Sequence, residues 1–173
     1  DLYGGKKLPE LLNRLSELEG IQWIRLLYCY PEVITDELIR TMAENPKVCH
    51  YIDMPIQHSE DAILRAMGRR TNQAQIRDVV SRLRKAMPDI TIRTTLITGF
   101  PGETKEQHDA LMQFVDEMEF ERLGVFTYSP EEGTRAADMP DQIDEDVKKQ
   151  WQEEIMALQQ EVSYDNNQLS LIH

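Results

Sequence analysis

The sequence predicts an α/β fold, an incomplete TIM-type barrel with a parallel sheet of about four strands and outer helices. Apolar residues alternate along the chain between helical and strand-like spacing, which is typical of βα units. Each strand candidate has one apolar face and one polar face, as expected for strands that line a lumen. The chain has 173 residues, whereas a closed eight-stranded barrel needs roughly 250. We therefore expect a partial barrel.

The first half of the chain contains two strand candidates. Leucines at helical spacing predict a helix from Leu8 to Leu18, and residues 22–28 (QWIRLLY) form the first candidate strand. Thr35 is the expected N-cap of the next helix. Residues 50–56 form the second candidate strand, and a short helix is expected over residues 59–67.

The second half repeats this alternation. A helix is expected over residues 72–87, followed by a strand over residues 90–97 (ITIRTTLI), which is rich in β-branched residues. Thr104 and Gln107 have the spacing of a capping box, so they predict the start of a helix that ends near Met118.

The last elements suggest a boundary between two parts. Residues 122–128 form the fourth candidate strand, and a loop rich in Gly, Pro and acidic residues leads to a long polar helix over residues 144–168. We expect residues 1–143 to be the partial barrel. Residues 144–173 are expected to be a C-terminal helix and a linker toward a further domain.

Two architectures contain parallel strands separated by helices. A doubly wound sheet has helices on both faces, whereas a barrel has them only outside. The polar and aromatic residues favour the barrel because alternation places them on one face of the four strands: Arg25, Tyr51, Asp53, Gln57, Arg93, Thr95, Gly124, Phe126 and Tyr128. We expect the strands to follow the order of the sequence, with residues 22–28 and 122–128 at the two borders. The residues expected to open onto a cleft are Arg25, Asp53, Arg93 and Tyr128.

Composition excludes several classes of protein. The net charge is -12, and no run of basic residues offsets it. The sequence therefore contains no strong nucleic-acid-binding patch. No apolar stretch is long enough to span a bilayer, and the N-terminus carries no signal peptide. Only Cys29 and Cys49 are present, which excludes a disulfide framework and favours a cytoplasmic protein. The chain lacks an initiator methionine, so we interpret it as a piece of a longer protein.

Ligands of parallel α/β folds bind at the carboxyl ends of the strands. The four loops at these ends are rich in proline and glycine and cover residues 29–32, 55–59, 98–104 and 129–134. Gly99 and Gly102 do not form a dinucleotide-binding G-x-G-x-x-G pattern, and no P-loop lysine follows them. These glycines therefore either approach a ligand closely or only permit a tight turn.

Several side chains in these loops have two interpretations. His58 is a metal ligand or, more simply, a polar pocket or capping residue, because no other ligand stands at the required spacing. Glu131 and Glu132 form a pair for acid–base chemistry or are merely solvated. Cys29 has no base beside it in the sequence, which argues against a nucleophile. The residues thus indicate no metal ligands and leave the catalytic residues unknown.

Three charged residues are expected on the lumen side. Asp53 lies on the strand between those of Arg25 and Arg93, and a buried charge must be paired. The three residues therefore form a salt-bridge layer, or Arg93 binds a ligand carboxylate as a fork.

Five ordered motifs make the chain resemble the radical S-adenosylmethionine methylthiotransferases. The motifs are YCYP (residues 28–31), PIQH (55–58), MGR (67–69), TTLITGFPGET (94–104) and YSPEEGT (128–134). The resemblance extends from Tyr3 and Gly4 to the helix around Trp151. It is strongest to the RimO-type branch, which modifies an aspartate of small-subunit ribosomal protein twelve. It implies that the chain is a fragment of a radical SAM core.

The resemblance implies cofactors and site residues. The full-length parent would use S-adenosylmethionine and 4Fe-4S clusters, and the cluster ligands are not in this chain. The residues implied to bind S-adenosylmethionine are Gln57, His58, Ser59, Arg93, Thr95, Gly99, Phe100, Gly102, Glu103, Phe126 and Tyr128. The implied partner is ribosomal protein twelve. The isolated chain is expected to be inactive, and its exposed sheet edge is expected to allow self-association.

Two other functions remain open. The branch of the family that modifies transfer RNA shares the chemistry, although the acidic charge argues against it. A catalytically inert α/β scaffold is the second alternative.

Overall fold

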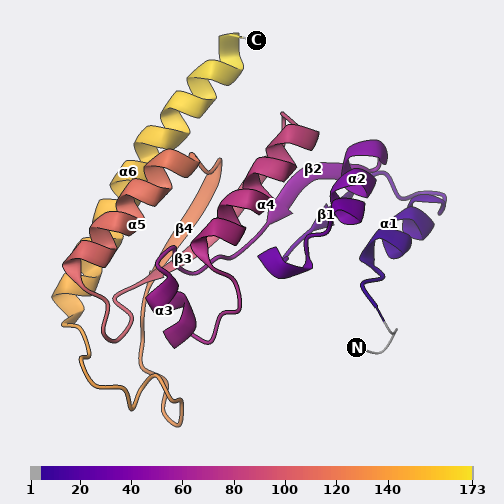
Figure 1. Ribbon diagram of the computed structural model, residues 1–173. Coiled ribbons are helices and arrows are strands. Elements are labelled where there is room, and N and C mark those ends of the chain that lie inside the picture. The colour runs from indigo at the N-terminus through magenta and orange to yellow at the C-terminus, as the bar shows by residue number, and fades with distance from the viewer. Residues whose placement is uncertain (1–4, 173) are drawn as a thin grey trace.

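The computed structural model describes the backbone of residues 5–172 and the side chains of residues 5–168. Tyr3 and Gly4, where the resemblance begins, lie outside the described residues. In chain order the elements are α1 (Leu8–Ser16), β1 (Ile24–Leu26), η1 (Pro31–Val33), α2 (Asp36–Glu44), β2 (Val48–Asp53), α3 (Asp61–Ala66), α4 (Gln73–Ala86), β3 (Thr91–Thr98), α5 (Lys105–Met118), β4 (Arg122–Thr127) and α6 (Glu145–Ile172) (Figure 1).

The four strands form one parallel sheet in the order β1-β2-β3-β4. The expected order and the two border strands are therefore confirmed. Burial alternates along β3, where every second residue is buried and the intervening residues are half-buried. One face of the sheet is thus covered by helices and the other is partly open, as the partial barrel requires and the doubly wound fold does not.

The core lies between the sheet and its helices. Ile52 and Ile92 are completely buried, and they join the apolar faces of α2, α4 and α5 in one cluster. The helix starts predicted from capping residues are confirmed. Thr35 accepts a hydrogen bond from the Leu38 N–H, and Thr104 forms a capping box with Gln107.

Two strands differ from their predicted bounds by two residues or more. The first spans only Ile24–Leu26, and Tyr28, inside the predicted range, has a left-handed backbone with φ of 57° that does not continue the strand. The second begins two residues early at Val48 and ends at Asp53, shortly before Pro55, which has no N–H to donate. Gln57 then returns to the sheet as an isolated bridge to Leu96. The chain is thus irregular at the carboxyl ends of both strands.

Helix α6 is longer than predicted and is anchored along about its first two thirds. Trp151, Ile155 and Val162 are buried, and the Trp151 ring stacks on His108 of α5 with ring centroids 4.7 Å apart. His108 Nε2 lies 2.8 Å from Glu154 Oε2. Burial lowers the pKa of His108, although the hydrogen bond to Glu154 opposes this effect. Beyond Val162 the described side chains of α6 are exposed or only partly buried.

The expected salt-bridge layer is present in part. Arg93 Nη1 lies 2.7 Å from Asp53 Oδ1, whereas Arg25 stacks on the Tyr51 ring at 4.4 Å instead of pairing with Asp53. The prediction that Asp53 opens onto a cleft is wrong, because Asp53 is covered by its partner Arg93 and by the Tyr28 backbone N–H. Tyr128 is largely buried in a small apolar cluster, but it does line a pocket, as expected.

The β1 border carries exposed apolar side chains. Trp23 is 82% exposed and Leu27 is 58% exposed. Strand β1 pairs with β2 alone among the described strands, so one of its backbone edges is unpaired there. Self-association through this edge stays a prediction. None of the helices in the described part of the chain is long and apolar enough to cross a membrane.

Candidate functional site

A pocket of about 500 Å³ lies at the carboxyl end of the sheet, where ligands of parallel α/β folds bind. Gln57, Phe100 and Tyr128, which come from three different strand-to-helix loops, were predicted from the sequence. The pocket is completed by residues that were not predicted: Ala66, Met67, Gly68, Arg69, Ile97, Arg135 and Ala136. The structure therefore brings three of the implied binding residues together in one cavity.

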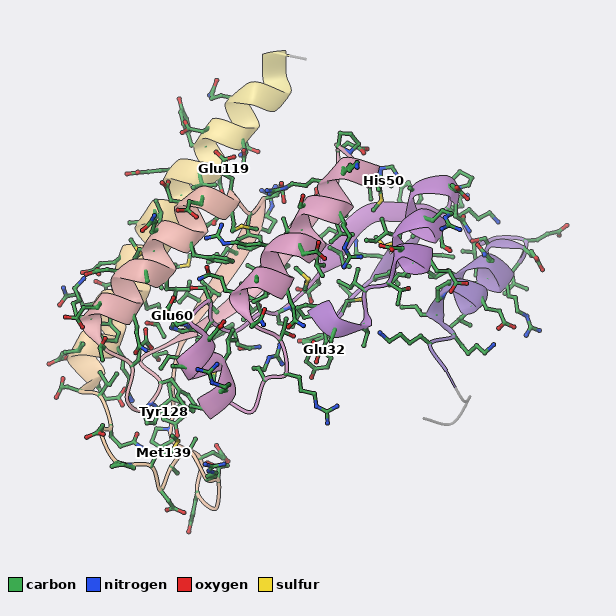
Figure 2. The ribbon with its side chains drawn as sticks, viewed as in Figure 1. Glu32, His50, Glu60, Glu119, Tyr128 and Met139 are labelled. Atoms are coloured by element: carbon green, nitrogen blue, oxygen red, sulfur yellow. The ribbon has the colours of Figure 1, made fainter. Side chains whose placement is uncertain are left out.

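The apolar wall of the pocket is an aromatic pair. Phe100 and Tyr128 meet edge to face, with ring centroids 5.2 Å apart and planes at 70°. Ile63 of α3 and Met139 of the loop before α6 pack against them. Tyr128 and Met139 lie close together below α3, at the end of the molecule where the carboxyl ends of β3 and β4 point (Figure 2). The loop of residues 129–143 is thus part of the site.

Two residues of the pocket lining each carry a buried polar atom that has no partner among the described residues. Gln57 Oε1 and Tyr128 Oη are both buried, and neither makes a hydrogen bond with any described residue. Buried polar atoms cost free energy when they are unpaired. Gln57 also has a left-handed backbone with φ of 73°, and strained conformations of this kind gather at functional sites. This lining suits a ligand that has both a planar apolar part and polar groups.

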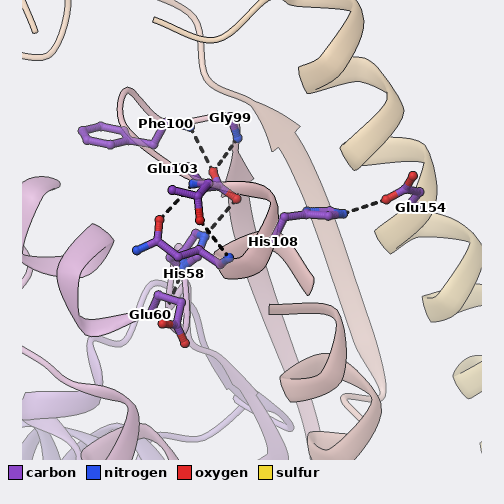
Figure 3. A network of polar contacts seen from close by, with 9 residues as sticks. His58, Glu60, Gly99, Phe100, Glu103, His108 and Glu154 are labelled. Atoms are coloured by element: carbon purple, nitrogen blue, oxygen red, sulfur yellow. Dashed lines mark hydrogen bonds and ion pairs between the residues drawn. The ribbon is translucent and has the colours of Figure 1, made fainter. Parts of the chain in front are cut away.

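A buried carboxylate fixes the loop that carries Phe100. Glu103 Oε2 accepts hydrogen bonds from the backbone N–H groups of Gly99 at 2.7 Å and Phe100 at 3.1 Å (Figure 3). Glu103 Oε1 lies 3.2 Å from His58 Nε2, and both side chains are completely buried. His58 Nδ1 accepts from the Glu60 N–H at 3.0 Å, so the ring hydrogen is on Nε2, on the side of the carboxylate, although Nε2 and Glu103 Oε1 do not form a hydrogen bond.

This arrangement connects two loops of the pocket. His58 follows Gln57 after β2, and Glu103 holds Gly99 and Phe100 after β3. His58 therefore acts as a buried polar and capping residue. Its ring nitrogens face protein groups below the pocket wall, and it does not reach into the cavity.

Arg69 provides a positive charge at the pocket. Its guanidinium donates to the Pro55 carbonyl oxygen and lies 4.8 Å from the centre of the Tyr30 ring. Arg135 stands on the opposite loop and is exposed. Arg69 belongs to the MGR motif, but it is not among the residues that the resemblance implies to bind S-adenosylmethionine. An arginine within one of the five motifs was the signal that could have identified it.

The other implied residues lie around the pocket rather than in its lining. Ser59 is buried below it, and Thr95 and Arg93 lie on the half-open face of the sheet. Phe126 pairs in register with Ile97 and is 60% exposed on that face. Gly102 turns away from the pocket, and its N–H donates to the Asp141 carbonyl.

A buried lysine behind the pocket was missed from the sequence. Lys148 of α6 is 1% exposed, and its ammonium donates to the Tyr128 carbonyl oxygen at 3.1 Å. Its alkyl chain passes over Gly99, where an added Cβ would lie only 2.3 Å from Lys148 Cγ. Gly99 also has a φ of 76°, which favours glycine. Both the turn and the close approach therefore require this glycine.

The described residues do not fit a 4Fe-4S cluster. Such a cluster is held by cysteine thiolates, and no group of three or more Cys, His, Asp or Glu suited to a metal occurs in the described part of the chain. Cys29 is buried, and burial together with the negative charge of Asp53 raises the pKa of its thiol, which opposes a thiolate ligand or nucleophile. Glu131 and Glu132 are exposed, in agreement with the solvated interpretation.

Comparison with known proteins gives one matching family. The family described as the radical SAM superfamily matches residues 3–115. Curated relatives named ribosomal protein uS12 methylthiotransferase RimO are similar over nearly the whole chain. The relative from Lachnoclostridium phytofermentans is 56% identical over 165 residues, which are 95% of this chain and 38% of that protein. The relative from Geobacter sulfurreducens is 53% identical over 167 residues, 96% of this chain and 37% of that protein.

Solved structures show the same fold. Coproporphyrinogen III oxidase (HemN) from Escherichia coli, a radical SAM enzyme, matches with a TM-score of 0.72 at 18% identity, covering 93% of this chain and 38% of that chain. The radical S-adenosylmethionine methyltransferase TsrM from Kitasatospora setae, solved with cobalamin and a [4Fe-4S] cluster, matches with a TM-score of 0.56 at 19% identity, covering 70% of this chain and 24% of that one. This chain thus spans less than two fifths of the length of the relatives above.

Proposed function

Because the chain belongs to the radical SAM superfamily, we propose that it is the S-adenosylmethionine-binding core of a longer methylthiotransferase that modifies an aspartate of ribosomal protein uS12. The pocket at the carboxyl end of the sheet carries this proposal, since its aromatic wall and its two unpartnered polar atoms match a ligand with a base and several polar groups. The names of the curated relatives, which specify ribosomal protein uS12, support the proposed substrate.

The residues of the pocket suggest a division of roles. Phe100 and Tyr128 provide an apolar surface for the adenine. Gln57 Oε1 accepts a hydrogen bond from an amino group of the ligand, and Tyr128 Oη makes a second polar contact. Arg69 attracts the carboxylate of the methionine moiety. S-adenosylmethionine, when bound, supplies the reactive groups, while this chain orients the molecule and keeps water away.

The cluster ligands belong to other parts of the longer protein in this proposal, because the described residues offer no suitable set. A ribosomal substrate also implies that the protein works in the cytoplasm. The acidic net charge of -12 favours a protein substrate over transfer RNA, since an RNA-binding surface would need a segregated basic patch.

The substrate is tested in a strain that lacks the gene. Ribosomal protein uS12 and transfer RNA are isolated from this strain and from the same strain complemented with the full-length protein, and both are analysed by mass spectrometry. We expect a methylthio group on the uS12 aspartate only after complementation. Restoration of a methylthio group on transfer RNA, with uS12 unmodified, would contradict the proposal.

The pocket is tested with a Tyr128→Phe variant of the full-length protein. The substitution removes a hydroxyl without a partner among the described residues, so the folded chain loses no contact, but the ligand loses a hydrogen bond. We expect S-adenosylmethionine affinity, measured by equilibrium dialysis, to fall roughly threefold to tenfold, with an unchanged melting temperature. Tyr164→Phe on α6, where the ring is 64% exposed, is the matched control and should keep full affinity. Equal affinity of the two variants would exclude Tyr128 Oη from the site.

A further inference from the structure

We propose that Lys148 is a positioning residue for the S-adenosylmethionine pocket, a role that rests on the proposed function of that pocket. Lys148 lies in the first turn of α6, outside residues 3–115 that match the superfamily. It does not line the cavity. It contacts the main chain of Tyr128 and of Gly99, the residue before Phe100, and so acts on the ligand only through the two lining residues Tyr128 and Phe100.

Burying the Lys148 side chain costs free energy. Its side chain is only 2% exposed, and removing an ammonium group from water costs several kcal/mol unless the group is well paired. Among the described residues its one carboxylate partner is Glu145, whose Oε1 lies 2.6 Å away and whose side chain is 75% exposed. An apolar side chain of the same length would fill this space without that cost. What the ammonium adds is a fixed contact with the main chain of Tyr128.

That contact holds the loop of residues 129–143, which lines the pocket. Lys148 Nζ donates to the Tyr128 carbonyl oxygen across 20 residues of sequence, and it also lies 5.3 Å from the centre of the Tyr128 ring. Between these residues runs the loop that supplies Arg135, Ala136 and Met139 to the pocket and its apolar cluster. The hydrogen bond therefore ties the end of this loop back to its beginning and limits how far Tyr128 can shift.

The alkyl chain of Lys148 fixes the neighbouring loop. It fills the space beside Gly99, whose N–H and that of Phe100 are held from the other side by Glu103. The backbone that positions Phe100 is thus confined between two side chains. One is the carboxylate of Glu103, just before α5, and the other is the methylene chain of Lys148 from α6. Lys148 contacts both loops that carry the aromatic pair, and it sets the separation of the two rings.

The test uses a Lys148→Met variant of the full-length protein. Methionine keeps the length and the apolar contact with Gly99 but removes the ammonium, and the exposed Glu145 is left solvated. We expect S-adenosylmethionine affinity, measured by equilibrium dialysis, to fall about tenfold, while the melting temperature is unchanged or higher. A merely structural lysine would lower the melting temperature and leave the affinity of the folded protein intact.

Two further variants sharpen the comparison. Lys149→Met makes the same change at the exposed neighbouring residue and should leave the affinity unchanged. Glu145→Gln alters only an exposed side chain, so the protein folds, and the weaker anchoring of the ammonium should lower the affinity by a smaller factor, about twofold.

The outcomes separate this inference from the proposed function. If the unmodified protein does not bind S-adenosylmethionine, both are overturned. If it binds and Lys148→Met binds equally well, only the role of Lys148 is overturned. The same holds if Lys148→Met loses affinity only together with a large fall in melting temperature while Glu145→Gln binds as tightly as the unmodified protein.

Discussion

Replacement of Glu103 tests the buried carboxylate that organises the pocket loop. In Glu103→Ala, the N–H groups of Gly99 and Phe100 lose their shared acceptor in a region where the carboxylate is completely buried. An unsatisfied buried donor costs about 1–3 kcal/mol, so two donors should lower the free energy of unfolding by about 2–6 kcal/mol. For a chain of this size, that loss corresponds to a fall of roughly 4–24 °C in melting temperature.

Glu103→Gln separates the two functions of the carboxylate. The glutamine oxygen still accepts from both N–H groups, but its amide group faces the Nε2–H of His58, donor against donor. We expect a smaller loss of about 1 kcal/mol. Glu153→Ala, at an exposed residue of α6, is the control and should change stability by less than about 0.5 kcal/mol.

The assay is urea unfolding followed by circular dichroism, with the free energy of unfolding compared at equal slope. The expected order of stability is Glu153→Ala, then Glu103→Gln, then Glu103→Ala. If Glu103→Ala proves as stable as Glu103→Gln, the two backbone hydrogen bonds do not hold the loop, and the structural role given to this carboxylate is refuted.

Three further predictions concern other parts of the chain. Burial lowers the pKa of His108 below the usual 6.5, so the unfolded chain binds more protons near that pH. The free energy of unfolding should therefore rise between roughly pH 5.5 and 7.5. His108→Gln should flatten this rise when urea unfolding is measured at each pH. An equally steep rise in the variant would contradict the role of His108. Arg93→Met leaves the buried Asp53 carboxylate without its ion-pair partner and should lower the free energy of unfolding by about 2–3 kcal/mol. Asp53→Asn should lower it less, because the Arg93 side chain is 41% exposed and stays solvated. The reverse order in urea unfolding would argue against the pairing. Anaerobic iron reconstitution of the isolated chain should give no stoichiometric cluster absorbance, because Cys29 and Cys49 lie on different elements; stoichiometric absorbance would contradict this.

The general fold could be predicted because its signals are local. The period of apolar residues identifies the strands and helices, and the capping residues Thr35 and Thr104 mark where two helices begin. The strand ends could not be predicted, since the left-handed backbones of Tyr28 and Gln57 belong to residue types that do not favour that conformation. Those two irregularities depend on tertiary contacts.

The candidate site was predictable as a set of loops but not as a set of contacts. Gln57, Phe100 and Tyr128 share the pocket as expected, whereas Phe126 stays on the open face of the sheet. Lys148 is preceded by no signal that distinguishes it from Lys149, the adjacent lysine, which is exposed. Its helical phase was the available signal, because residues 148, 151, 155 and 162 of α6 follow the spacing of a buried face. A charged residue in that phase was easily overlooked.

The partial anchoring of α6 gives the helix mechanical leverage. Its 28 residues span about 42 Å at 1.5 Å per residue, and its end projects past the sheet (Figure 1). Buried residues from Lys148 to Val162 hold the helix, and about 15 Å of rod separate Val162 from Ile172. A tilt of about 5° about Val162 would displace the far tip by about 1 Å. Because the helix is stiff, a larger tilt would strain the buried face that also carries the contact between Lys148 and the Tyr128 carbonyl. The far end of α6 is thereby mechanically connected to the pocket.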